Sequence, residues 1–167
     1  VVFNKPNSAI SEELKAFHQE PLHYEGEICF VVQNGDFAGV GFGLDLTKRA
    51  LQGQLKQKGL PWERAKAFDG SAVFSEFVGI SAQDINSELQ LSLAIDGFQA
   101  QQGGVALMMY QPKEMLKELK SFISLQDGDI VMTGTPKGVG VIEAGAEFTG
   151  TILLGDRVLV TQTWRAS

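Results

Sequence analysis

The sequence predicts a single α+β domain that consists mostly of strands with a few short helices. Two dipeptides typical of tight hairpin turns, Asn34-Gly35 and Asp96-Gly97, lie between runs of strand-forming residues. Glycine makes up 19 of the 167 residues, above its usual share of about 7%, and this favours many turns. Because hairpins alternate with separate helices and no strand–helix–strand order repeats, a doubly wound parallel sheet is not expected. No shift in composition divides the chain, so residues 1–167 are expected to form one domain.

The expected strands are short runs of alternating or continuous apolar residues, bounded by glycine, asparagine or aspartate. They cover residues 23–32, 37–44, 74–78, 88–95, 98–102, 129–133 and 150–164. The first two should form a hairpin around Asn34-Gly35. The fourth and fifth should form another around Asp96-Gly97.

Two helices are expected from the spacing of their apolar side chains. In residues 47–58, two leucines one turn apart share a face, and lysines and glutamines fill the other. Residues 112–122 have the same amphipathic pattern, with a methionine and two leucines inward. The segment 4–22 is irregular apart from a helix-start pattern at Ser11, which marks a third, short helical candidate.

The composition limits the kinds of function that are expected. The chain carries 14 lysines and arginines against 20 acidic residues, a formal charge of −6, which argues against a nucleic-acid partner. No apolar run approaches the ~20 residues that span a bilayer, and the first residues lack a signal-peptide pattern. We therefore expect no membrane association and a cytoplasmic location. The single cysteine, Cys29, excludes an internal disulfide and a cysteine-based zinc site.

Two glutamates on the first expected strand are candidate metal ligands. Side chains alternate along a strand, so Glu25 and Glu27 point to the same face. Their carboxylates repel each other, and a positive group between them would offset that cost. A hard divalent cation accepts oxygen ligands of this kind. The alternative is a solvent-exposed glutamate pair on an edge strand.

A second polar group lies where the next strand meets the helix. Asp45 ends that strand, and the hairpin can bring it beside Glu25 and Glu27; alternatively it is a helix N-cap. Asp45, Arg49 and Gln52 are spaced to share one helical face. They form either a solvated stripe or a site at which Arg49 binds a substrate carboxylate.

A glycine-rich stretch, Thr133 to Gly140, follows an expected strand near the C-terminus. Its backbone N–H groups and hydroxyls can bind an anion, or the stretch is a tight turn. The order of its residues is not that of a phosphate-binding P-loop.

Taken together, these segments resemble the fumarylacetoacetate hydrolase family. The resemblance covers nearly the whole chain, and its small one-domain members of the acylpyruvate hydrolase and oxaloacetate decarboxylase type are the most similar. The matching segments are Lys5-Pro6, His23-Tyr24-Glu25-Gly26-Glu27, Gly43-Leu44-Asp45-Leu46-Thr47-Lys48-Arg49, Pro61-Trp62 through Asp69, Gln102-Gly103, Gly128-Asp129 through Gly140, and Gly155-Asp156. The resemblance implies a mixed β-roll and a homodimer.

The resemblance also implies a role for individual residues. The positions that correspond to the carboxylate ligands of Mg²⁺ or Mn²⁺ are Glu25, Glu27 and Asp45. The positions that surround the bound 2-oxo acid are Arg49, Gln52, Lys66 and Thr135. Of these, Arg49 and Lys66 are expected to be catalytic by holding the charged end of the substrate, and Thr135 to hydrogen-bond an oxyanion. The alternative for Lys66 is an ordinary surface lysine.

Close members of the family carry a further N-terminal lid segment, whose histidine and glutamate activate water. This chain begins after that segment, so we expect the lid to be missing. His18 and Glu20 are either a replacement base or surface loop residues, and their spacing would not bring them to one helical face. His23 should share the face of Glu25 and Glu27, either to orient a ligand or as a packed side chain.

Three functions are compatible with these observations. The first is a Mg²⁺- or Mn²⁺-dependent hydrolase or decarboxylase that cleaves a C–C bond of a small 2-oxo acid, an acylpyruvate or oxaloacetate, through a metal-stabilised enolate. The second is an isomerase or tautomerase of a 2-oxo dicarboxylate, which needs proton transfer but no activated water. The third is a non-catalytic member that only binds a metal and small acids.

Overall fold

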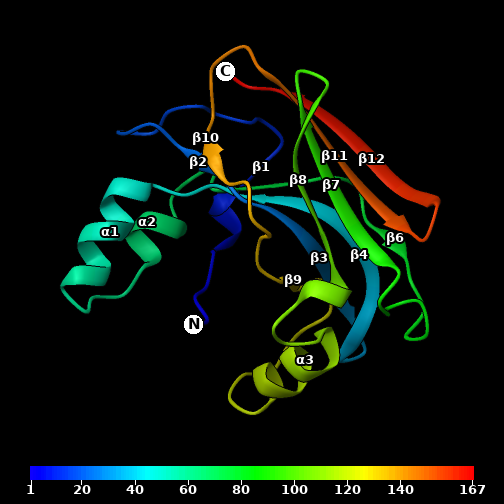
Figure 1. Ribbon diagram of the computed structural model, residues 1–167. Helices are drawn as coiled ribbons and strands as arrows, with labels where there is room; N and C mark the ends of the chain where they lie inside the picture. The colour runs from blue at the N-terminus through cyan, green and yellow to red at the C-terminus, as the bar shows by residue number, and fades with distance from the viewer.

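Two curved sheets pack against each other and enclose the core in a computed structural model of the protein, which describes residues 1–167 (Figure 1). The strands are β1 (Ile10–Ser11), β2 (His23–Tyr24), β3 (Gly26–Gln33), β4 (Asp36–Asp45), β5 (Ala72–Phe74), β6 (Val78–Gly79), β7 (Leu89–Ile95), β8 (Phe98–Gly104), β9 (Ile130–Met132), β10 (Gly140–Val141), β11 (Glu147–Leu154) and β12 (Arg157–Arg165). The helices are α1 (Arg49–Gln57), α2 (Glu63–Lys66) and α3 (Pro112–Lys120), with short 3₁₀ turns at Asn7–Ala9 and Val105–Leu107.

The topology is mixed rather than a set of simple hairpins. The larger sheet has the order β1-β5-β4-β3-β9, with β6 paired to β4, and only β1 and β5 run parallel. The second sheet, β12-β11-β7-β8, is antiparallel throughout, and β10 pairs with β2. Helices α1 and α2 lie together at one side of the sheets, and α3 lies at another end (Figure 1). This arrangement confirms the mixed, strand-rich α+β fold with a few short helices.

The β3–β4 hairpin has two different faces. Ile28 pairs with Phe42, and both side chains are fully buried in the core cluster between the sheets. The opposite face carries Cys29 and a row of glycines from β4. A Cβ atom at Gly43 would lie 2.4 Å from the Cys29 sulfur, so only glycine fits there. Each face of β3 is therefore covered, which explains why its first five residues are all buried.

The predicted hairpins are confirmed, and their turns have the predicted chemistry. Asn34-Gly35 joins β3 to β4, and Asp96-Gly97 joins β7 to β8; all four residues have positive φ, as a two-residue hairpin turn requires. Residues 150–164, also expected to be strand, lie in a third hairpin, formed by β11 and β12. Its turn contains Gly155, which also has a positive φ.

The predicted helices are confirmed in two of three cases. The spans 47–58 and 112–122 correspond to α1 and α3, each somewhat shorter than expected. The helical candidate at Ser11 is wrong, because Ser11 pairs with Val73 in the parallel β1–β5 ladder. The short helix α2 was not predicted. The helices are too short and too polar to span a bilayer.

Candidate metal centre

Three buried carboxylates meet at the open end of the β3–β4 hairpin. Glu25 lies directly before β3, Glu27 lies on β3, and Asp45 ends β4. The hairpin register brings them together: the Asp45 N–H donates to the Glu25 carbonyl at 2.9 Å. One oxygen from each side chain lies within 4.8 Å of the others, and the residues are 8%, 4% and 3% exposed. The alternative of an exposed edge-strand pair is therefore wrong. So is the N-cap role for Asp45, because α1 begins four residues later.

Lys66 connects two of these carboxylates. Its ammonium donates to Glu25 Oε2 at 2.9 Å, to Asp45 Oδ2 at 2.6 Å and to the Thr47 hydroxyl at 2.6 Å. The short helix α2 places it there, and the residue is only 2% exposed. The surface-lysine alternative is therefore wrong. Because an ammonium has three N–H groups, every donor of Lys66 is engaged within the protein.

Arg49 and Gln52 lie one turn apart at the start of α1, beside the same cluster. Arg49 forms an ion pair with Glu25 at 3.2 Å and donates to Gln52 Oε1 at 3.1 Å. Gln52 is buried, whereas the Arg49 side chain is 36% exposed. A guanidinium has five N–H donors, so Arg49 retains donors for a ligand while it holds Glu25. The structure thus brings both predicted residues to the carboxylates, although Asp45 is not on their helix.

Lys5 is a member of the cluster that the sequence analysis did not assign. Its ammonium lies 2.7 Å from Asp45 Oδ1, and it donates to the backbone carbonyls of Lys66 and Ser71. Its side chain is 10% exposed. The motif Lys5-Pro6 was part of the family resemblance, but nothing local in it indicates a partner 40 positions away. A lysine in an irregular segment is ordinarily a solvated side chain.

The cluster balances its charges but leaves one carboxylate poorly compensated. Glu25, Glu27 and Asp45 face the three cations Lys5, Arg49 and Lys66. Burial and, secondly, the neighbouring Asp45 carboxylate raise the pKa of Glu27 to about 8. The Gly134 N–H, which donates to Glu27 Oε2 at 2.7 Å, opposes that rise. Burial lowers the pKa of Lys5, and its contact with Asp45 opposes this change.

The donor set fits a hard divalent cation. Asp45 Oδ1 is fully buried, and the charged group beside it is the Lys5 ammonium at 2.7 Å. Glu27 accepts a hydrogen bond through Oε2 only, so Oε1 remains available. Oxygen donors from three carboxylates match the preference of Mg²⁺ and Mn²⁺, and a cation there would offset the burial and the repulsion that raise the Glu27 pKa.

The glycine-rich stretch lies against the ligand strand. Besides the Gly134 contact with Glu27, the Thr135 hydroxyl donates to the Gly26 carbonyl at 2.9 Å and accepts from Gln101 Nε2 at 2.8 Å. The stretch is therefore more than a free turn, since it binds the backbone between Glu25 and Glu27. The single proton of the Thr135 hydroxyl is directed at Gly26 in this arrangement.

The three other candidate side chains have different positions. Glu20 accepts from the Ala50 N–H at 3.0 Å and so caps the start of α1. His18 stacks on Phe68 with ring centroids 5.0 Å apart. His23 is half-buried, and burial and then Arg49 lower its pKa. The charge of Glu25 opposes this lowering of the His23 pKa.

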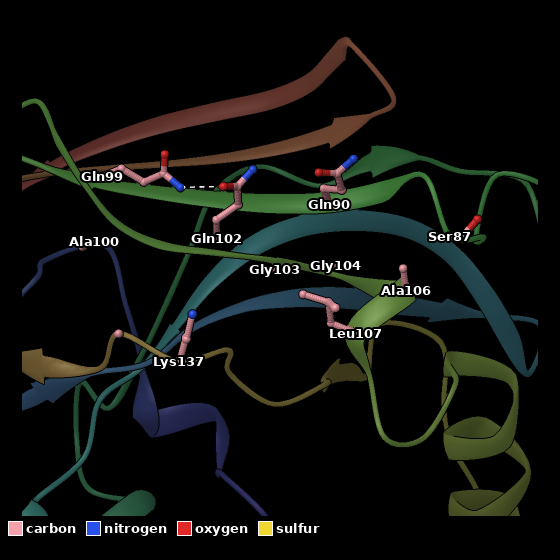
Figure 2. Close-up of a pocket in the computed structure, with 11 residues that line it drawn as sticks. Ser87, Gln90, Gln99, Ala100, Gln102, Gly103, Gly104, Ala106, Leu107 and Lys137 are labelled. Atoms are coloured by element: carbon pink, nitrogen blue, oxygen red, sulfur yellow. Dashed lines mark hydrogen bonds between the residues drawn. The ribbon is translucent and has the colours of Figure 1, made fainter.

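A solvent-open cavity is separate from this centre. It measures about 660 Å³ and lies between β8 and the stretch after Thr133, open to solvent (Figure 2). Gln99 and Gln102 point into it and are joined by a 2.7 Å hydrogen bond, with Lys137 on the facing side (Figure 2). A bulge in β8 opposite Leu93 and Ala94 places these two glutamines on one face. None of the carboxylates or cations of the centre lines the cavity.

The sheets and the buried carboxylates define a strand-rich domain with a centre that can hold a divalent ion. The chain belongs to the fumarylacetoacetate hydrolase family: residues 1–163 match the family described as fumarylacetoacetate (FAA) hydrolase C-terminal. This confirms the resemblance found in the sequence.

Two relatives illustrate the similarity in sequence. The oxaloacetate tautomerase YcgM of Escherichia coli is 44% identical over 117 residues, which are 68% of this chain and 52% of that protein. A mitochondrial oxaloacetate tautomerase of Homo sapiens is 33% identical over 181 residues, 99% of this chain and 80% of that protein. The first match thus spans about half the length of the bacterial relative.

Solved structures show the same fold. A crystal structure from Oleispira antarctica has a TM-score of 0.93 at 34% identity, over 100% of this chain and 82% of that chain. A fumarylpyruvate hydrolase from Pseudomonas aeruginosa, in complex with Mn²⁺ and pyruvate, has a TM-score of 0.86 at 30% identity. That match covers 98% of this chain and 77% of the other.

Proposed function

We propose that this protein is a divalent-metal-dependent tautomerase, which interconverts the keto and enol forms of a small 2-oxo dicarboxylic acid such as oxaloacetate. The observation that carries the proposal is the buried cluster of Glu25, Glu27 and Asp45, surrounded by three cations. The bacterial and the human relative are both named oxaloacetate tautomerases. They support the isomerase alternative of the sequence analysis better than its first expectation, a C–C hydrolase or decarboxylase.

Mg²⁺ or Mn²⁺, held by Glu25, Glu27 and Asp45, would polarise the 2-oxo group of the substrate as a Lewis acid. Tautomerisation moves one proton between C3 and the 2-oxo oxygen, and negative charge develops on that oxygen as the C3–H bond breaks. The ordinary role of a protein in such a step is to orient the substrate and to place fixed dipoles and charges around it.

Arg49 is the residue we assign to the carboxylate of the substrate. It is the most exposed cation of the cluster, and it keeps unused N–H donors while Glu25 and Gln52 hold its guanidinium. A planar guanidinium binds a carboxylate through two parallel hydrogen bonds. Gln52 acts by fixing the guanidinium, and Thr135 acts by holding the Gly26 carbonyl next to Glu27.

Lys66 and Lys5 act through the carboxylates rather than on the substrate. All three donors of Lys66 are engaged, so it cannot bind a substrate without leaving Glu25, Asp45 or Thr47. We therefore assign Lys66 to orienting the metal ligands, although the sequence analysis placed it next to the substrate. Lys5 supports Asp45 from the other oxygen. Partners of this kind tune ligand geometry and are often worth about 10–100-fold in affinity or activity.

Hydrolysis or decarboxylation remains the second candidate. Its specific support is the similarity to the fumarylpyruvate hydrolase structure that contains Mn²⁺ and pyruvate. Both reactions pass through an enolate of a 2-oxo acid, so one centre can serve either. They differ in the products, and that difference can be measured.

One assay separates the candidates. The protein is mixed with oxaloacetate, or separately with acetylpyruvate, in the presence of Mn²⁺ or of EDTA. Enol absorbance and pyruvate are followed separately, and the rates with Mn²⁺ but no protein are subtracted. Metal-dependent loss of the enol signal without pyruvate supports the tautomerase. Metal-dependent pyruvate release identifies a decarboxylase, and acetylpyruvate cleavage identifies a hydrolase. Mn²⁺ binding without turnover of either compound would leave only a metal-binding protein and would overturn the proposal.

A further inference from the structure

Gln101 is a buried polar side chain that touches the ligand strand without being a ligand. It lies on β8, opposite Leu93 of β7, and is only 1% exposed. Its neighbour Gln102 points the other way, into the open cavity (Figure 2). A buried amide is costly unless its hydrogen bonds are made, so its partners indicate why it is there.

The amide of Gln101 joins three segments that are far apart in the sequence. Its Oε1 accepts from the Gly26 N–H at 2.8 Å. Its Nε2 donates to the Thr135 hydroxyl at 2.8 Å and to the Pro136 carbonyl at 2.9 Å. The orientation of the amide is dictated by its partners, because the Gly26 N–H can only donate and the Pro136 carbonyl can only accept.

Gly26 is the residue between the two glutamate ligands. Side chains alternate along the strand, so Gln101 holds the face of this segment opposite to Glu25 and Glu27. The fit is close: a Cβ atom at Gly26 would lie 3.0 Å from Gln101 Oε1 and 3.0 Å from Phe42 Cζ. Gly26, which sets the spacing of the Glu25 and Glu27 carboxylates, is thus held in place by the side-chain amide of Gln101.

The same amide fixes the direction of the Thr135 hydroxyl. Thr135 accepts from Gln101, and its only proton goes to a backbone carbonyl: that of Gly26 at 2.9 Å, which is closer than that of Pro136 at 3.4 Å. One lone pair of Oγ1 remains for any other partner. Toward a bound ligand the hydroxyl is therefore an acceptor, whereas the sequence analysis expected it to donate to an oxyanion.

We propose that Gln101 is a positioning residue of the carboxylate centre, which fixes the Glu25–Glu27 peptide and orients the Thr135 hydroxyl as an acceptor. The enol of a 2-oxo acid carries an O–H group that such an acceptor suits, whereas the keto form has none. This second half rests on the proposed function. The first half concerns only the protein and its ion.

The test compares Gln101→Met with Gln102→Met. The first keeps the length of the side chain and removes every hydrogen bond, and the second changes the exposed neighbour. Mn²⁺ affinity is measured by the electron paramagnetic resonance signal of free Mn²⁺ and corrected for the folded fraction. We expect Gln101→Met to weaken Mn²⁺ binding by about 10-fold or more, the range seen for outer partners of metal ligands. Gln102→Met should leave it within about twofold of the wild type.

A double-mutant cycle with Thr135→Val tests the second half. If Gln101 acts on the substrate through Thr135, Gln101→Met should lower kcat/KM much less in the Thr135→Val background than in the wild type. Equal losses in both backgrounds would overturn that half. If Gln101→Met does not fold, Gln101→Glu replaces it in the cycle, since it can accept from Gly26 but, when ionised, cannot donate to Thr135.

A merely structural glutamine would give a different result. It would lower the melting temperature of Gln101→Met and leave the Mn²⁺ affinity of the folded molecules unchanged, which would overturn the proposal. If the wild type shows no tautomerisation, the proposed function fails on its own. The Mn²⁺ affinities still decide the role of Gln101, because they do not depend on turnover: weaker binding by Gln101→Met than by Gln102→Met supports it, and equal affinities overturn it.

Discussion

The two faces of β3 are buried to the same extent and for opposite reasons. On one face, Ile28 and Phe30 are 0% exposed in the core cluster, and Phe30 stacks on Phe37 at 4.6 Å. On the other face, Glu27 is 4% exposed among charges. Burial stabilises the first face directly, because apolar surface leaves water. Burial of the second face costs free energy unless cations and hydrogen bonds offset it.

This difference shows where the protein gives up stability for a site. Alternation puts apolar and acidic side chains on one strand, so the strand itself cannot slide without exposing its core residues. The face with Ile28 and Phe30 (the apolar face) therefore fixes the register of the face with Glu27 (the acidic face). Substitutions on the apolar face should lower stability and leave metal binding almost unchanged. Substitutions of the acidic residues should weaken metal binding without lowering stability.

The largest effect is expected for Glu27→Gln. Loss of a ligand should weaken Mn²⁺ binding by more than about 100-fold, since outer partners alone cost about 10–100-fold. The metal-free protein should nevertheless melt at a higher temperature, because a neutral amide avoids the cost of either protonating the buried Glu27 side chain or burying its charge. Titration with Mn²⁺ and thermal melts in EDTA measure both quantities. Glu13→Gln, at an exposed position, is the control. Unchanged Mn²⁺ affinity would show that Glu27 is not a ligand.

The opposite face should respond in the opposite sense. Phe30→Ala removes a fully buried ring and should lower the free energy of unfolding by about 3–5 kcal/mol. Urea denaturation measures this change, and Phe98→Ala, at a residue that is 80% exposed, is the control. Mn²⁺ affinity of the folded molecules should change little. If Phe30→Ala lowers the free energy of unfolding no more than Phe98→Ala does, the apolar face does not stabilise the strand.

The acidic face should also make stability depend on pH. The pKa of Glu27 is raised from its ordinary 4.5 to about 8, so between these values the folded protein binds a proton that the unfolded chain has released. The metal-free protein should therefore lose stability as pH rises from about 5 to 8, with a slope of at most about 1.4 kcal/mol per pH unit. Urea denaturation in EDTA at several pH values measures the slope. Glu27→Gln should flatten it, and an equal slope in that variant would assign the titration to another group.

The contrast between the faces also separates what the sequence could predict from what it could not. Asn34-Gly35 and Asp96-Gly97 give hairpins because their positive φ values are set locally. The Glu25 and Glu27 face follows from alternation along one strand. The short strands β1 and β10 form only because distant partners, β5 and β2, pair with them, so their own residues carry little signal.

Site residues whose partners are far away in the sequence could not be predicted for the same reason. Lys5 meets Asp45 across 40 positions, and Gln101 meets Gly26 across 75. Neither residue lies in a local pattern that requires burial, and lysine and glutamine are mostly exposed in proteins. The family resemblance named residues near the substrate, whereas these two act behind the carboxylates.

The smallest effect is expected for Lys5→Met, which tests whether a remote cation offsets the cost of the acidic face. Without this ammonium, 2.7 Å from Asp45 Oδ1, that buried oxygen has no positive partner, so the metal-free protein should melt at a lower temperature. A divalent cation should then restore more stability than it gives the wild type, because it replaces the missing charge and no longer meets repulsion from Lys5. Thermal melts with EDTA and with Mn²⁺ measure both shifts, and Lys15→Met, at an exposed position, is the control. If the metal-free variant melts at the same temperature as the control, Lys66 alone stabilises the Asp45 carboxylate, and Lys5 does not offset the cost of burying it.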